Sequence, residues 1–249
     1  SADNAASTTQ SNNTASFTEK VVPTISSVSL NAANSELTVT FSESVYDTTG
    51  GSGDLEAADF ALSVAGGVAD VGSATPTSIA KTSQSVWVLG FTATGTPNGS
   101  EVLTVVPAGA TSIYDGAANA ASTTQSNNTA SFTEKVVPTM AITAAEVGDG
   151  GTSNDATLSL TFTSSEATTN FVVGDIGGSG GTISNFAATS TTVYTATFTP
   201  TTSGATAINV AAGAFTDAAG NDNTNASMSW VYDGTVPTMA ITAAEVSDG

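Results

Sequence analysis

The chain of 249 residues carries 22 acidic residues against three lysines, which gives a net charge of −19. Such a negative surface repels the phosphates of nucleic acids and the headgroups of anionic lipids, so neither is an expected partner. The sequence contains no His and no Cys, which excludes disulfides, imidazole or thiolate catalysis, and zinc or copper ligands of those types. No run approaches the roughly 18 apolar residues of a membrane-spanning helix, so membrane insertion is not expected either.

Two stretches of the sequence occur twice. AASTTQSNNTASFTEKVVPT is identical at 5–24 and 120–139, and TMAITAAEVGDG at 139–150 returns at 238–249 with a single change. Both duplications meet at a Val-Pro-Thr tripeptide, so the joints of a tandem array are marked by Pro23, Pro138 and Pro237.

The spacing of these joints predicts units of about 100 residues, each large enough for a core of its own. In chain order we expect the final strand of a preceding repeat (1–20), a larger domain (21–135), a smaller domain (136–235) and the first strand of a following repeat (236–249).

Alternation of apolar and polar residues predicts strands in the larger domain. Leu37, Val39 and Phe41 alternate with threonines, which is typical of a half-buried strand. Similar patterns occur at 59–65, 85–92, 101–106 and 129–133, and Thr14–Thr18 is expected to be the core of the strand that precedes this domain. An acidic insertion at 47–59 interrupts the series.

The smaller domain repeats the scheme, with strands expected at 140–142, 158–162, 182–188, 192–199, 205–210 and 225–231. The glycine-rich stretch 174–184 has a weak likeness to a phosphate-binding loop. Because neither a helix-forming segment nor a lysine follows it, we interpret it as a flexible connection between strands. The fold class is therefore all-β: tandem antiparallel sandwiches of about seven strands each.

Acidic residues recur at matching positions of the two domains. Glu43 and Glu166 follow an alternating strand at the parity of its buried side chains, so they are expected to point inward. Each domain also has an Asp that follows an apolar residue, with three residues between them. Each domain has, in addition, an Asp that is followed four residues later by an Asn. These are Asp59 and Asp175, then Asp115 with Asn119 and Asp217 with Asn221.

An inward carboxylate needs a partner, and three lysines cannot serve all these acids. Ligands that are all oxygen atoms favour Ca²⁺, so the eight residues are predicted calcium ligands in two sites. The alternative is that each Asp caps its own turn and each Glu is solvated at the rim of the sandwich.

Acids also recur at the joints, where Glu19, Glu134 and Asp233 each lie four residues before the joint proline and Asp149 follows in the next unit. Glu134, Asp149 and Asp233 are candidate ligands of a linker cation. The ordinary alternative, a solvated acid in a linker, is the favoured interpretation because surface acids usually bind nothing.

An enzyme is not expected. Without His or Cys, catalysis would require a carboxylate pair or an isolated serine, and no pair of acids stands apart from the recurring ones. The tryptophans and tyrosines are dispersed at strand-like spacing, which indicates packing and not a substrate cleft.

The smaller domain resembles the bacterial immunoglobulin-like repeats of large surface proteins and adhesins, through VPTMAITAA, LSLTFTSSEATTNFVVGDI, GTISNFAATSTTVYTATFTP and INVAAGAFTDAAGN. The larger domain resembles a more distant member, through FSE, DF and YDGAAN. The resemblance implies a seven-stranded immunoglobulin-like sandwich, an extracellular location at the bacterial cell surface, and a role as an extender or adhesive module that is often stiffened by calcium.

We therefore expect a structural repeat module of an exported bacterial surface protein, forming a calcium-stiffened stalk or filament whose partners are neighbouring repeats of the same protein. Two alternatives stay open. One is an adhesive module that binds a glycan or another surface. The other is self-assembly into a fibre, in which an orphan strand near 14–18 or 238–244 completes a neighbouring subunit by strand addition.

Overall fold

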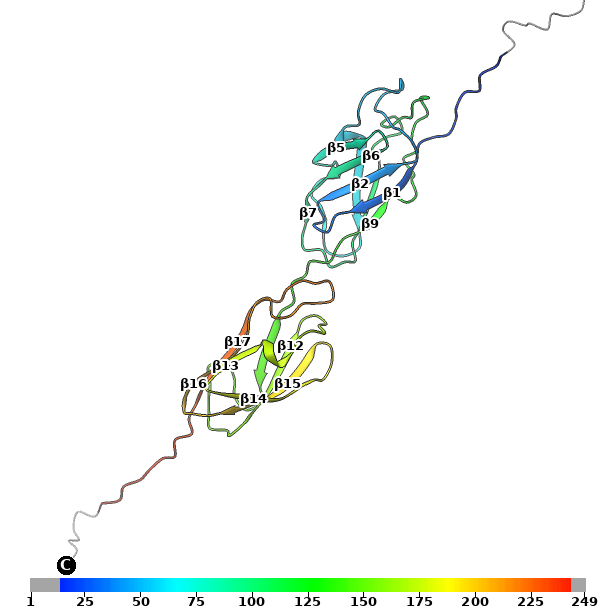
Figure 1. Cartoon of the computed structure of the whole chain (residues 1–249). Helices are drawn as coiled ribbons and strands as arrows, with labels where there is room; N and C mark the ends of the chain where they lie inside the picture. Colours follow the sequence, from blue (N-terminus) through cyan, green and yellow to red (C-terminus); the bar gives the residue numbers. More distant parts are fainter. Residues whose placement is uncertain (1–13, 243–249) are drawn as a thin grey trace, which may run out of the picture. The chain divides into compact units, whose positions relative to one another are not determined.

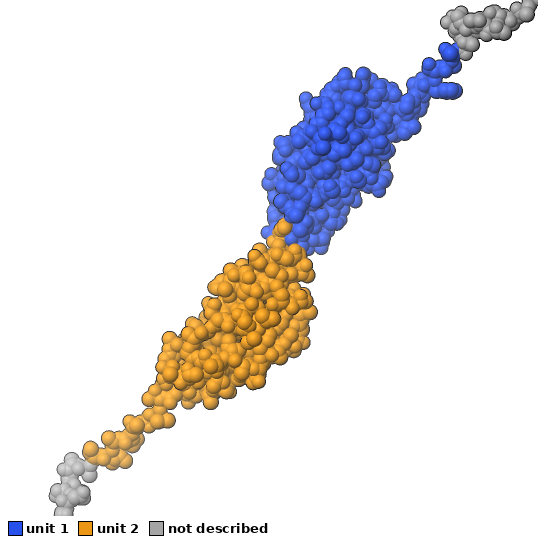
Figure 2. All heavy atoms as spheres, viewed as in Figure 1, with its two compact units in different colours: residues 1–134 blue, residues 135–249 orange. Residues whose placement is uncertain are grey.

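A computed structural model describes residues 14–242 of the chain. It divides into two compact units, residues 1–134 and 135–249, which Figure 2 shows in different colours. All regular structure in the described residues is β apart from two short 3-10 turns, so the predicted all-β class is confirmed. No helix long and apolar enough to cross a membrane occurs between residues 14 and 242.

The first unit has a four-stranded antiparallel sheet in the order β1-β2-β6-β5, whose strands lie side by side in Figure 1. Their bounds are β1 Ile25–Leu30, β2 Glu36–Phe41, β6 Val86–Gly90 and β5 Ser78–Ser83. A second sheet has the order β3-β8-β9, with β3 Phe60–Ala65, β8 Val102–Pro107 and β9 Thr129–Ser131. Two short strands, β4 Asp70–Val71 and β7 Ala93–Thr94, pair separately, and a 3-10 turn, η1 Ala57–Asp59, precedes β3.

The core of the first unit lies between these two sheets. Alternate residues of β2 are buried, and so are alternate residues of β6 and β8, because successive side chains of a strand point to opposite faces. Phe132, just after β9, is buried and stacks on Phe91 with ring centroids 6.0 Å apart. The last strand therefore contributes directly to the core.

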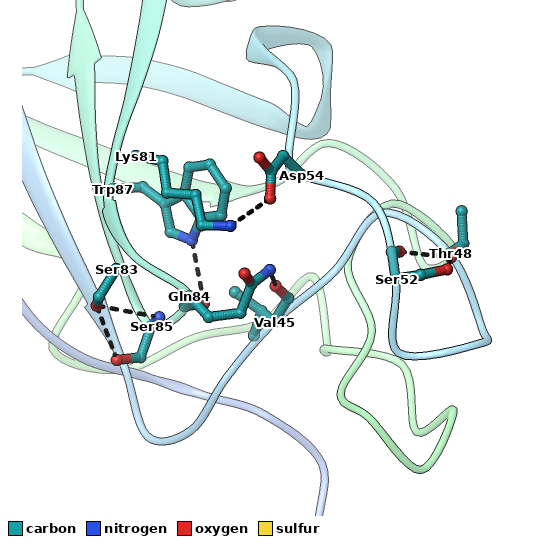
Figure 3. Close-up of polar contacts among 9 residues, drawn as sticks. All are labelled: Val45, Thr48, Ser52, Asp54, Lys81, Ser83, Gln84, Ser85 and Trp87. Atoms are coloured by element: carbon teal, nitrogen blue, oxygen red, sulfur yellow. Dashed lines mark hydrogen bonds and ion pairs between the residues drawn. The ribbon is translucent and has the colours of Figure 1, made fainter.

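The acidic insertion at 47–59 is fastened to the first sheet by side chains (Figure 3). Asp54 forms an ion pair with Lys81 of β5 at 2.5 Å, and the Lys81 ammonium lies 5.6 Å from the centre of the Trp87 ring. Gln84 Nε2 donates to the Val45 carbonyl (2.7 Å), and Gln84 in turn accepts a hydrogen bond from Trp87 Nε1 (3.3 Å). The insertion is thus attached to β5 through Asp54, and Val45 just before it is held by Gln84.

The second unit also has two sheets, in the orders β10-β12-β15-β14 and β11-β17-β16-β13. The first contains β10 Met140–Ala144, β12 Leu158–Ser164, β15 Val193–Pro200 and β14 Gly181–Ala188. The second contains β11 Thr152–Ser153, β17 Ala226–Tyr232, β16 Gly204–Val210 and β13 Ile176–Ser179, which follows the 3-10 turn η2 Val173–Asp175. All neighbouring pairs are antiparallel except β11 with β17.

An aromatic cluster fills one end of this second sandwich. Phe171 contacts four other rings at centroid distances between 5.1 and 5.7 Å, namely those of Phe162, Phe186, Tyr194 and Phe215. Edge-to-face pairs of this kind are favoured by the ring quadrupoles. Leu158, Leu160 and Phe198 continue the core toward Trp230.

The interpretation of 174–184 as a flexible connection is wrong. This stretch contains β13 and the start of β14, joined at Gly180, whose φ is +81°. The glycines are needed for close packing, because a Cβ on Gly181 would lie 2.4 Å from the Phe198 ring and one on Gly178 would lie 2.9 Å from Ile208. Small residues here leave room for the side chains of the neighbouring strands β15 and β16.

The terminal copies of the repeats form no strand where they are described. Residues 14–24 and 239–242 have no regular structure, although Thr14–Thr18 was predicted as a strand core. The remaining parts of the predicted terminal strands, 1–13 and 243–249, lie outside the described residues. That these segments are strands of neighbouring repeats stays a prediction.

Candidate functional site

The two Asp and Asn pairs form the same closed turn in both units. Asp115 Oδ1 accepts hydrogen bonds from Asn119 N (2.7 Å) and Ala117 N (2.8 Å), and Asp115 Oδ2 accepts one from Asn119 Nδ2 (2.7 Å). In the second unit, Asp217 Oδ1 accepts from Asn221 N (2.9 Å) and Asp217 Oδ2 from Asn221 Nδ2 (2.8 Å). The i, i+4 spacing therefore brings the two members of each predicted pair together, and they are hydrogen bonded to each other.

These hydrogen bonds set the ionisation of the two aspartates. Desolvation raises the pKa of Asp115, but the N–H groups of Asn119 and Ala117 outweigh it and hold the pKa below its usual value. The pKa of Asp217 is lowered in the same way, with desolvation opposed by the Asn221 side chain and backbone. Both groups are therefore ionised at neutral pH, and Asp115 is fully buried in that state.

Asp59 and Asp175 also have the same role in their two units. Asp59 Oδ2 accepts from Glu56 N (2.7 Å) and Asp175 Oδ2 accepts from Val172 N (2.8 Å), each closing the 3-10 turn that leads into the next strand. The recurrence of an Asp after an apolar residue thus reflects a shared turn.

The two glutamates at the strand ends are partly exposed. Burial raises the pKa of Glu43, and the negative charges of Asp115 and then Glu19 raise it further. Glu166 has one oxygen, Oε2, turned away from solvent, and its backbone N–H approaches Ser164 Oγ at 3.5 Å. Both glutamate side chains thus lie at the edge of the sandwich and are partly turned toward its interior.

The predicted ligands of the first unit fall into two groups. Glu43 lies near Asp115 and Glu19, whereas Asp59, whose pKa is raised by burial and by Asp47, lies near Asp47 and Glu56. In the second unit, the segment after Glu166 reaches the closed turn through Asn170, whose Oδ1 accepts from Thr216 N (3.1 Å). As placed, residues 14–242 contain no group of three or more His, Cys, Asp or Glu side chains able to hold a metal ion.

The joint acids make local contacts. Asp149 Oδ1 accepts from Ser229 N (2.8 Å), and Asp233 accepts from Thr235 N (3.0 Å), a hydrogen bond that lowers the pKa of Asp233. Glu134 is partly buried and lies against Gly99. Asp233 also lines a polar cavity of about 380 Å³ with Glu146, Asn154 and Asp155.

Glu101 is an acidic residue that the sequence interpretation missed. Its side chain is fully buried, and Glu101 Oε1 accepts from Val68 N (2.8 Å), Ala69 N (3.0 Å) and Asn98 N (3.2 Å). Burial alone would raise the pKa of Glu101, but these N–H donors lower it to about 2. The signal was present, since Glu101 shares the parity of the buried Leu103 and Val105.

Both units belong to the class of small antiparallel β-sandwiches by their two packed sheets and alternating burial. Residues 134–233 match the sequence model of the bacterial Ig-like domain family. The resemblance predicted for the smaller domain is therefore confirmed over these residues. A search of curated proteins gives no match.

Solved structures similar to the chain include the Escherichia coli adhesin FdeC (18% identity, 84% of this chain, 63% of that chain, TM-score 0.37). Others are the N-terminal part of the bacterial S-layer protein SbsC (17%, 84%, 44%, 0.33) and InvD of Yersinia pseudotuberculosis (18%, 90%, 64%, 0.31). The chain spans less than two thirds of the length of each.

Proposed function

We propose that the chain is a structural repeat module of an exported bacterial surface protein, in which Ig-like sandwiches are strung in series. The observation that carries this proposal is the unchanged segment at 5–24 and 120–139. Its second copy contains β9 and Phe132 of the first unit and runs directly to β10. One connector that leads into two different units is what a modular array requires.

The contacts of the joint support this role. Thr24 N donates to Ser42 Oγ (3.0 Å) and Ser42 N donates to the Thr24 carbonyl (2.8 Å). The same reciprocal pair joins Thr139 and Ser165 of the second unit, at 2.9 Å in each direction. In both units the threonine of Val-Pro-Thr is thus hydrogen bonded to the serine that precedes Glu43 or Glu166. The connector is therefore attached to each unit by the same pair of hydrogen bonds.

A test of this proposal is surface proteolysis of intact bacteria that express the full-length protein. We expect an antibody against the two units to detect a protein that protease removes from living cells while a cytoplasmic marker survives. Retention of the protein inside cells under all growth conditions would contradict the proposal.

We propose further that calcium binds at the rim of each unit and stiffens it. In the first unit the ligands would be carboxylate oxygens of Glu19, Glu43 and Asp115 and the amide oxygen of Asn119, whereas Asp59 lies apart from them beside Asp47 and Glu56. The counterpart ligands in the second unit are Glu166, Asp175, Asp217 and Asn221. What supports this is a donor set made only of oxygens, which suits calcium, and the position of Glu43 beside Asp115 and Glu19, whose charges add to the effect of burial in raising the pKa of Glu43. Bound calcium would neutralise this crowded charge.

Thermal unfolding with calcium and with a chelator tests the calcium proposal. A bound ion raises stability by mass action, so we expect calcium to raise the melting temperature. The Glu43→Gln variant should lose the calcium effect on the first unit, while its stability in chelator stays equal or rises because a repulsion is removed. Glu36→Gln, an exposed acid of β2, is the matched control. A melting curve that calcium and chelator leave unchanged would remove the idea.

A glycan-binding role is the second candidate, favoured by one cavity of about 450 Å³ in the second unit. The nearly buried Phe171 and Tyr194 line it together with Thr168, Ser190 and Thr191, a combination of aromatic and polar residues that suits a sugar ring. Binding on a glycan array that Thr191→Val abolishes would support this role. Absence of binding at millimolar sugar would count against it.

A further inference from the structure

The turn between β7 and β8 of the first unit carries the only Asn-Gly step of the sequence, Asn98–Gly99. Both residues are exposed. The side-chain Cγ of an asparagine and the next backbone nitrogen can close a five-membered ring, and a following glycine has no side chain to obstruct the closure. Such a step reacts with itself where the fold holds the amide against the next peptide, leaves that nitrogen free and admits water.

The amide of Asn98 is held in place by the turn. Ser100 N donates to Asn98 Oδ1 (3.0 Å), an Asx turn that folds the side chain back along its own backbone. This hydrogen bond polarises the amide carbonyl and stabilises the negative charge that develops on Oδ1 when a nucleophile attacks Cγ. The backbone is fixed as well, because Asn98 N donates to Glu101 Oε1 (3.2 Å) and Oε2 (3.0 Å). The amide is therefore both ordered and activated.

The nitrogen that would attack this amide is available. Gly99 N donates no hydrogen bond to any group within residues 14–242, and Gly99 has a φ of +81°, which glycine adopts at no steric cost. An exposed N–H of this kind gives its proton to solvent hydroxide without breaking a contact. The folded chain therefore presents the nucleophile in a usable state.

A turn of the second unit has the same hydrogen bond without these properties. Thr235 N donates to Asp233 Oδ1 (3.0 Å) across Gly234, which is the arrangement of Asn98. Gly234 N, however, donates to Ser203 Oγ (3.0 Å). The hydrogen bonds from Thr235 also lower the pKa of Asp233, so its side chain is an ionised carboxylate and a poor electrophile. The turn of the first unit is thus the reactive one of the two.

We propose that the first unit modifies itself at Asn98. Gly99 N, having lost its proton to solvent, attacks Asn98 Cγ. The new N–Cγ bond closes a succinimide ring, and Nδ2 takes up a proton and leaves as ammonia. Water then opens the ring, either at Cγ to give aspartate or at the backbone carbonyl carbon to give isoaspartate. The net reaction consumes one water and releases one ammonia, so it needs no oxidant, reductant or enzyme.

Both products change the surroundings of a buried charge. They place a carboxylate on residue 98, whose N–H binds the buried carboxylate of Glu101. Isoaspartate also adds one methylene to the main chain between these two groups, so their hydrogen bond loses its geometry. The reaction therefore acts as a slow, irreversible timer that loosens the first unit. It goes beyond the modular role above and depends on neither calcium nor location, so its test can fail while that role stands.

Ageing of the full chain in its folded form tests the proposal. Peptide mapping by mass spectrometry and labelling by an isoaspartate methyltransferase should show aspartate and isoaspartate accumulating at residue 98, faster as pH rises because Gly99 N must lose its proton. Exposed Asn185, which precedes Phe186, is the internal control and should convert several-fold more slowly. The chain unfolded in urea gives the reference rate. If Asn98 persists in the folded chain while the unfolded chain converts, the turn protects the amide and the proposal is overturned.

The Asn98→Gln variant is the matched control, because its longer side chain would have to close a less favourable six-membered ring. Gly99→Ala is unsuitable, since its Cβ would lie 3.2 Å from Glu134 Cβ. Hydroxylamine, which attacks the succinimide, should cut the folded parent chain into fragments 1–98 and 99–249 and leave the Asn98→Gln chain whole.

Ageing should also lower the denaturant midpoint that Trp87 reports in a Trp230→Phe background, and the Asn98→Gln chain should keep its midpoint. An equal fall in both chains, or no cleavage of the parent chain, overturns the proposal.

Discussion

The two units contain the same Asp to Asn turn with different residues at its left-handed position. In the first unit this position is Ala118, with φ of +70°, and in the second it is Gly220, with φ of +90°. The aspartate carboxylate receives the amide and backbone N–H of the Asn in both turns. The hydrogen bonds therefore fix the turn, and the residue at the left-handed position decides only how much strain it carries.

Buried charge is a second difference between the units. The first unit encloses Glu101, whereas alignment of the shared Val-x-Ala-Gly-Ala motif places Ala205 at that position of the second. Glu101 ties together two turns, at Val68–Ala69 and at Asn98, through their backbone N–H groups. Stability of the first unit should therefore depend on one carboxylate, and that of the second unit should not.

The largest expected effect comes from Glu101→Gln. The amide places a donor where a backbone N–H needs an acceptor, and an unsatisfied buried donor of this kind costs about 2 to 3 kcal/mol. Each unit holds one tryptophan, Trp87 or Trp230, so denaturant unfolding of single-tryptophan variants reports each unit separately. Only the first unit should lose stability, and Glu36→Gln is the control. Equal loss in both units would show that they unfold together.

The pH dependence of the first unit follows from the same carboxylate. The pKa of Glu101 is about 2 in the folded chain against 4.5 for an unperturbed glutamate. A depressed pKa contributes stability that is complete above the unfolded value and lost as pH falls toward the folded one, here from about pH 5 to pH 2 and amounting to about 3 kcal/mol. The Trp87 signal should record this loss, and Glu101→Gln should flatten it. A curve of unchanged slope in that variant would assign the acid sensitivity to other groups.

The sequence predicted the sheets well where one face of a strand is buried. β2, β8 and β12 alternate strictly in burial, so their apolar residues recur with period two. β5 was missed because it is an edge strand with almost every side chain exposed, and β1 because serine fills most of its polar positions. A strand held mainly by its neighbour's backbone leaves little periodic signal in its own sequence.

The candidate sites were predictable only as far as local spacing reaches. Asp115 with Asn119 and Asp217 with Asn221 lie within one turn, so their association follows from the sequence. Whether Asp59 approaches Glu43 depends on the path of the insertion at 47–59, which no local pattern encodes, and the insertion instead places Asp47 beside Asp59. Glu101 could have been predicted as an inward-pointing acid in the same way as Glu43, because it is an even number of residues from the buried side chains of its strand.

Exchanging the left-handed residues tests the comparison of the two turns. A non-glycine residue in this conformation costs about 1 to 2 kcal/mol, so Ala118→Gly should stabilise the first unit and Gly220→Ala should destabilise the second, each by about 1 kcal/mol. A Cβ at Gly220 meets no atom within 4 Å, so the effect is conformational. Thermal unfolding measures both. Changes of the same sign in the two variants would mean that the turns differ in more than strain.

The smallest effect compares the two tryptophans, which are both nearly fully buried. Trp87 Nε1 donates to the Gln84 carbonyl (3.3 Å), whereas Trp230 Nε1 is buried without a hydrogen-bond partner among residues 14–242. Replacing either by phenylalanine removes the same volume, so the difference between the two losses reports the indole N–H together with the contact between Lys81 and the Trp87 ring. We expect Trp87→Phe to cost about 1 kcal/mol more than Trp230→Phe, since only the former gives up a hydrogen bond. Calorimetry of the two variants measures this difference, and a larger loss for Trp230→Phe would show that its N–H is satisfied in solution.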